Sequence, residues 1–82
     1  MTERDVVDVY FVVDPCSNPQ ERLSIGYMRG GRFYPPAISL ASGLGWWRLT
    51  PEQQTCIRMC MEWLRAGEPV DSISPQLIAV PR

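Results

Sequence analysis

A double glycine near the middle of the chain, Gly30-Gly31, constrains the fold of these 82 residues more than any other feature. Glycine adopts positive φ angles readily, and a two-residue turn of type I′ requires such angles at both central positions. The residues on either side are compatible with strands. The sequence therefore predicts a tight β-hairpin whose register pairs Arg29 with Arg32, Met28 with Phe33 and Tyr27 with Tyr34.

The strand that leads into this hairpin is expected at residues 22–28, where apolar residues alternate with polar or small ones. Such alternation is typical of a strand with one buried face. The return strand should be short, because Pro35-Pro36 cannot donate hydrogen bonds to a neighbouring strand. Alternation places Leu23, Ile25 and Tyr27 on one face and Arg22, Ser24 and Gly26 on the other.

Two further segments are expected to extend this sheet. Residues 6–13 are β-branched and aromatic, and a turn-forming Asp14-Pro15 follows them. Both faces of that segment are apolar apart from Asp8, which favours a central position in the sheet. Residues 76–80 lie between two prolines and are expected to form a last strand or an extended tail packed on the core.

An α-helix is predicted at residues 51–66. Thr50 is suited to the N-cap, a proline occupies the first helical position, and Gln53 completes a capping box three residues after the cap. Gly67 is expected to cap the C-terminus, and Pro69 should prevent the helix from resuming. The expected helix is therefore bounded by local signals at both ends.

The apolar residues of this helix recur at helical spacing, so that one stripe should face the sheet. Arg58, Glu62 and Arg65 lie on the opposite side at spacings that favour ion pairs. Packing this stripe on the sheet gives the predicted core, which consists of Val7, Val9, Phe11, Val13, Ile25, Ile57, Cys60, Met61 and Leu64.

These elements predict a single α+β domain over residues 1–82, an antiparallel sheet with one helix packed across a face. The chain is 45% hydrophobic and 21% charged, a composition that favours a folded domain over a disordered segment.

The N-terminus does not resemble a signal peptide and no apolar run is long enough to span a bilayer, so a cytoplasmic location is expected. Residues 37–47, with Gly43-Leu44-Gly45, are expected to form a loop, because the motif lacks the lysine of a phosphate-binding loop.

The side chains that catalysis and metal binding usually need are scarce. The chain has no histidine, which removes the commonest general base and metal ligand. Its three cysteines fall short of a four-ligand zinc site, and Cys56 and Cys60 are expected to pack as small apolar residues without forming a disulfide. Asp8 and Asp14 should lie about 20 Å apart along one strand, too far to act on one bond. We expect no enzyme, no catalytic residue, no metal and no cofactor.

The charges divide along the chain. Residues 1–21 carry five acids and one arginine, whereas residues 22–51 carry four arginines and no acid. Like charges opposed across a hairpin cost stability, so Arg29 and Arg32 favour a binding role. Arginine and tyrosine are enriched at binding hot spots. The candidate partner-binding residues are Arg22, Arg29, Arg32, Tyr34 and Arg48.

Two partners are consistent with this basic, aromatic block. The first is a protein with an acidic surface. The second is nucleic acid, since arginine and aromatic side chains also hold single strands. The net charge of −1 favours the protein partner, because affinity for nucleic acid grows with the number of phosphates that are neutralised.

The segment VYFVVDPCSNP at residues 9–19, followed by a hairpin and a C-terminal helix, resembles some small phage-encoded anti-CRISPR proteins. That resemblance implies a compact, non-enzymatic inhibitor that binds a CRISPR surveillance complex or nuclease and blocks its access to DNA. It covers about a dozen residues and the order of the elements, and it assigns no functional residue.

Overall fold

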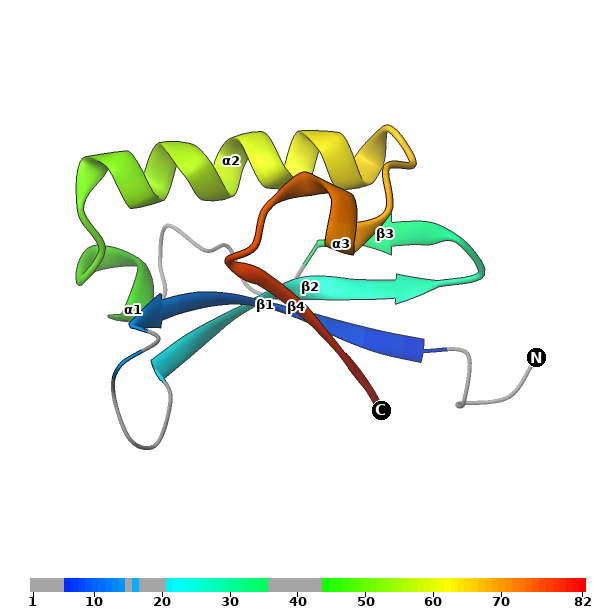
Figure 1. Ribbon diagram of the computed structural model, residues 1–82, viewed down its shortest axis with the longest axis horizontal. Coiled ribbons are helices and arrows are strands. Elements are labelled where there is room, and N and C mark those ends of the chain that lie inside the picture. Colours follow the sequence, from blue (N-terminus) through cyan, green and yellow to red (C-terminus); the bar gives the residue numbers. More distant parts are fainter. Residues whose placement is uncertain (1–5, 15, 17–20, 36–43) are drawn as a thin grey trace.

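The computed structural model describes residues 6–14, 16, 21–35 and 44–82. In this part of the chain four strands form one antiparallel sheet in the order β3-β2-β1-β4, and α2 crosses one face of it (Figure 1). The predicted α+β architecture is therefore confirmed. The elements are β1 (Val6–Asp14), β2 (Glu21–Arg29), β3 (Arg32–Tyr34), α1 (Leu44–Trp47), α2 (Pro51–Arg65), α3 (Val70–Ile73) and β4 (Leu77–Pro81).

The first strand has the predicted central position. β1 pairs with β2 on one side and with β4 on the other, antiparallel in both cases. The residues just before and after β4 are also bonded to β1. The amide of Val12 donates to the carbonyl of Gln76 at 2.8 Å, and the amide of Arg82 donates to the carbonyl of Val6 at 3.1 Å. The C-terminal segment is thus a strand of the sheet and not an extended tail.

The predicted hairpin is confirmed in every detail of its register. Gly30 and Gly31 have φ angles of 58° and 77°, and the three residue pairs on either side are those that the turn predicts. Because the turn allows only this pairing, Arg29 and Arg32 lie directly opposite each other at the tip.

The alternation predicted for β2 is interrupted by a β-bulge. Gly26 pairs with Val9, and Ser24 pairs with Tyr10, so that Ile25 is an extra residue between them. A one-residue insertion moves the following side chains to the opposite face. The prediction that Tyr27 shares a face with Leu23 and Ile25 is therefore wrong.

The N-terminal signal of α2 is satisfied by both bonds of the predicted capping box. The amide of Gln53 donates to the Thr50 hydroxyl at 3.2 Å, and the amide of Thr50 donates to the Gln53 side-chain oxygen at 2.9 Å. At the other end Ala66 is the C-cap, and Gly67 follows with a φ of 95°. The predicted start of this helix is confirmed, and its end lies at Arg65, one residue before the predicted one.

Two short helices depart from the predictions. The end of the expected loop, Leu44–Trp47, forms α1, because burial of Trp46 at 3% exposure fixes one helical turn against the core. Residues 37–43 of that loop lie outside the described residues. After Pro69 the chain forms α3, since the φ of −62° that proline imposes also suits the residue before a helix. Pro69 is the N-cap of this second helix.

The core lies between α2 and the sheet. Of the predicted core, Val13 and Met61 are half-buried and packed against it, and Val7 is half-buried outside the cluster. Trp46, Leu49 and Leu77 are buried members that the prediction did not include. The remaining predicted members are buried: Val9, Phe11, Ile25, Ile57, Cys60 and Leu64.

Candidate functional site

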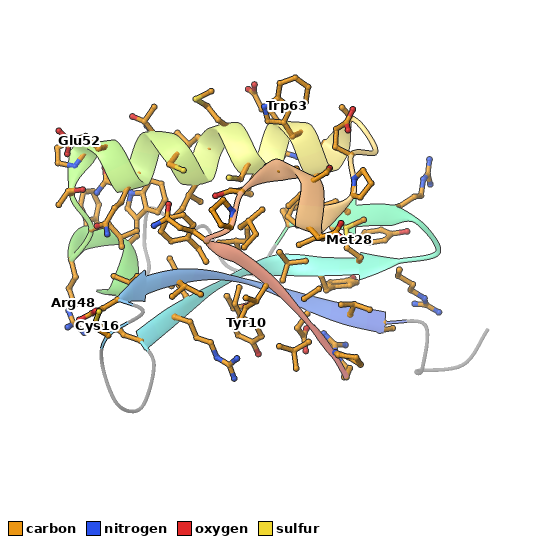
Figure 2. The ribbon with its side chains drawn as sticks, viewed as in Figure 1. Tyr10, Cys16, Met28, Arg48, Glu52 and Trp63 are labelled. Carbon is orange, nitrogen blue, oxygen red and sulfur yellow. The ribbon has the colours of Figure 1, made fainter. Side chains whose placement is uncertain are left out.

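The side of the sheet away from α2, here called the open face, is covered by none of the described helices (Figure 1). Figure 2 shows Tyr10 projecting on this side, away from α2. The pairing of the strands places arginines and tyrosines together there, and they flank one carboxylate. These side chains are Asp8, Tyr10, Arg22, Tyr27, Arg29, Arg32, Tyr34 and Arg82.

The bulge in β2 determines which side chains reach the open face. Before the bulge, Arg22 lies opposite Val12 with its guanidinium 4.5 Å from the ring centre of Tyr10. After the bulge, Tyr27 lies opposite Asp8 and stacks on Tyr34, with ring centres 5.1 Å apart and an interplanar angle of 13°. Both parts of the strand therefore contribute to one continuous surface.

Arg82 joins the far edge of the sheet to this surface. Its guanidinium contacts both carboxylate oxygens of Asp8, through Nη2 at 2.7 Å and Nε at 3.4 Å. The same group lies 5.3 Å from the ring centre of Tyr27. An arginine held by a carboxylate and an aromatic ring keeps a defined position, so less side-chain freedom is lost on binding.

The hairpin tip extends the open face beyond the body of the sheet. Arg29 lies opposite Val6, and Arg32 lies two residues before Tyr34, so both arginines share the side of Tyr27. Both are exposed. The tip therefore presents two positive charges in a fixed register beside a pair of stacked tyrosines.

Four of the five predicted partner-binding residues are brought together by this arrangement, namely Arg22, Arg29, Arg32 and Tyr34. Arg48 is not: it follows α1 at the end of the sheet far from the turn, where Nη2 lies 2.9 Å from Glu21 Oε1 (Figure 2). This ion pair links the acidic and basic segments of the chain. Both side chains are well exposed, so the pair contributes little stability.

Sequence reasoning missed four contributors to the open face. It considered Asp8 only for catalysis, placed Tyr10 in a covered strand and Tyr27 on the buried face, and gave Arg82 no role. The alternation of β1 could have identified Tyr10, because residues two apart on a strand share a face and Tyr10 lies two residues after the polar Asp8. No such signal exists for Arg82, since its place depends on a pairing between the two ends of the chain.

The cysteines form no comparable site. Burial, with a smaller contribution from neighbouring Cys56, raises the pKa of the Cys60 thiol to about 11, which keeps it protonated at neutral pH. Cys16 is exposed. Among the described residues, no three acidic, cysteine or histidine side chains gather as a metal site.

None of the described helices is long and apolar enough to cross a membrane.

Comparison with protein-family models, with curated proteins and with solved structures finds no match for this chain.

Proposed function

We propose that this protein is a small non-enzymatic binding protein that inhibits or regulates a protein partner by occupying an acidic surface of it. The observation that carries the proposal is the joining of the basic hairpin tip to the tyrosines of the open face. The residues of the open face are separated in the sequence by up to 74 positions, from Asp8 to Arg82, whereas the sheet makes them one surface.

The chemistry of the open face supports a protein partner. Arginine and tyrosine are the residue types enriched in protein interfaces, where lysine, glutamate and aspartate are depleted. Four arginines, at positions 22, 29, 32 and 82, accompany one carboxylate, Asp8, around the tyrosines. Half-buried Ile78 and Val80 of β4 add apolar area beside them. A complementary partner surface would be acidic with apolar contacts at its centre.

The packing of the rings argues against single-stranded nucleic acid. Bases bind to sheet surfaces by stacking on exposed aromatic faces. Here one face of Tyr10 is covered by Arg22, and Tyr27 is contacted by both Tyr34 and Arg82. Ring faces that are already covered leave hydroxyl groups and ring edges for contact, which suit hydrogen bonds to a protein.

The resemblance to anti-CRISPR proteins offers one specific partner class, a CRISPR surveillance complex or nuclease. The proposal does not rest on that resemblance. It rests on the residues of the open face, and any partner captured from the native host can be used to test it.

The test is binding of the captured partner to variants of the tip. Arg29→Ala/Arg32→Ala is expected to weaken binding by about 2 kcal/mol or more, because both charges lie at the proposed contact. Tyr34→Ala should weaken it as well. Arg48→Ala serves as the control for each single tip substitution, Arg29→Ala or Arg32→Ala, since it removes one positive charge from the far end of the sheet. Parental binding by the tip variants would contradict the proposal.

A salt titration distinguishes the nucleic-acid alternative. Affinity for single- or double-stranded DNA that falls steeply with salt, and that is lost in Arg29→Ala/Arg32→Ala, would assign the open face to nucleic acid. If the partner is a protein, we expect the affinity for DNA to be low and to be nearly the same in the parent and in Arg29→Ala/Arg32→Ala.

A further inference from the structure

A small hollow lies where the hairpin meets the last turn of α2. The two elements contact each other, and Figure 1 shows β3 beneath the C-terminal end of the helix. The hollow has a volume of about 280 Å³ and is lined by Gly31, Arg32, Phe33, Tyr34, Leu64 and Arg65. Because Arg32 and Tyr34 also belong to the open face, the hollow adjoins that face at one edge of the sheet.

Two arginines line the hollow and, among the described residues, no acidic side chain does. Within the same part of the chain, neither Arg32 nor Arg65 forms an ion pair. Glu62 and Glu68 are each three residues from Arg65 along the chain, but neither lines the hollow. The dipole of α2 favours a positive charge in its last turn, which accounts for Arg65 alone. It does not account for a second arginine at the same hollow.

The backbone of β3 adds a hydrogen-bond donor beside these charges. Hydrogen-bonded and non-hydrogen-bonded pairs alternate along antiparallel strands, and a two-residue turn is closed by a hydrogen-bonded pair. The closing pair here is Arg29 with Arg32, so Met28 and Phe33 form a non-hydrogen-bonded pair. The amide of Phe33 therefore points away from β2, toward the outer edge of the described sheet.

These donors are of the kind that hold an oxyanion in proteins. A guanidinium group donates two parallel hydrogen bonds to a carboxylate or a phosphate. Buried Leu64 and half-buried Phe33 form an apolar wall, which suits the carbon chain that carries such a group. The hollow is therefore suited to a single anionic side chain.

We propose that this hollow binds one oxyanion group, a carboxylate or a phosphate, that projects from the acidic surface of the partner. The group lies between Arg32 and Arg65, and its carbon chain packs on the apolar wall. This inference rests on the proposed function and deepens it, since it names the chemical group that the partner presents. It also extends the binding surface from the sheet to α2, because Arg65 belongs to the helix.

The first test needs no partner and uses inorganic phosphate as the probe. In an NMR titration at constant ionic strength, phosphate that replaces chloride is expected to shift the signals of the Phe33 amide and Arg65 Nε until they saturate. Arg65→Gln should abolish the saturable shift of the Phe33 amide. Arg58→Gln is the matched control and should retain it, because Arg58 lies on the same helix but over the ring of Trp46. A parent without saturable shifts, or an Arg65→Gln variant that retains them, would overturn the proposal.

The second test uses the partner captured from the native host. Arg65→Gln is expected to weaken binding by about tenfold or more, as the loss of a charged hydrogen bond does, and Arg58→Gln to leave it unchanged. Parental binding by Arg65→Gln, together with weakened binding by Arg29→Ala/Arg32→Ala, would overturn this inference and keep the proposed function. Parental binding by all three variants would overturn both. Phosphatase treatment of the partner weakens parental binding if the group is a phosphate and leaves it unchanged if the group is a carboxylate.

Discussion

At the scale of single residues, Gly26 determines the side on which the second half of β2 presents its side chains. Its φ of 145° is accessible to glycine and rarely to other residues. A Cβ built there would lie 2.4 Å from the backbone oxygen of Tyr34 and 2.6 Å from the Phe33 ring. The close approach of β3 and the bulge at Ile25 both require the absent side chain.

Gly26→Ala is therefore expected to destabilise the protein by about 2 kcal/mol or more, since backbone strain and a backbone clash add. Gly31→Ala is the control: its φ is also positive, at 77°, but a Cβ there meets nothing within 4 Å. It should cost about 1–2 kcal/mol through strain alone. Urea unfolding of both variants gives the difference, and equal losses would contradict a role for the close contact.

The Cys60 thiol makes stability depend on pH in the alkaline range. Its pKa rises from the usual 9.0 to about 11 in the folded protein, because burial disfavours the thiolate. The raised pKa contributes stability that is fully present below pH 9 and is lost as the pH rises through 11. The expected loss is roughly 2 kcal/mol. Cys60→Ala should show a smaller loss over this range in thermal unfolding, and an identical pH profile would argue against the raised pKa.

At the scale of elements, α2 combines two surfaces of different use. Its ends are set by local capping, and its core stripe holds Ile57 at 0% and Leu64 at 1% exposure. On another side of the helix, Met59 and Trp63 are 56% and 52% exposed. One amphipathic helix thus covers the core with one face and exposes two large apolar side chains on another.

Ile57→Ala or Leu64→Ala is expected to lower the free energy of unfolding by ~2–5 kcal/mol, because each leaves a cavity in a core that is small. Glu62→Ala, exposed on the same helix, should change it by less than about 0.5 kcal/mol. Chemical denaturation followed by circular dichroism measures both. An Ile57→Ala variant as stable as the parent would refute the packing of this stripe.

At the scale of the whole molecule, β1 holds the sheet together. Both β1 and β2 have partners on both sides, and one of the partners of β1 comes from the C-terminus. β3 has three residues and lies at an edge. Stability is therefore expected to be uneven across the sheet.

Native-state amide exchange should show this difference. Amides of β1 that donate within the sheet are expected to exchange only on global unfolding, and those of β3 through local opening. Exchange at a range of denaturant concentrations separates the two routes. Equal protection in β1 and β3 would mean that the hairpin opens only with the whole domain.

The sequence by itself determined the features that short-range chemistry controls. The double glycine set the turn and its register, Thr50 and Gln53 set the start of α2, and Gly67 set its end. Apolar periodicity identified most of the core and the central position of β1. These predictions succeeded because each depends on backbone preferences or spacing within a few residues.

Only the tertiary structure decided the open face. The bulge at Ile25 moves Tyr27 to that side, and it adjoins Gly26, where β3 approaches too closely for a side chain. Arg82 reaches Asp8 and Tyr27 because β4 pairs with β1 across the length of the chain. The helical turn of α1 depends on burial of Trp46. Such contacts join residues distant in sequence, and local preference carries no information about which distant segments meet.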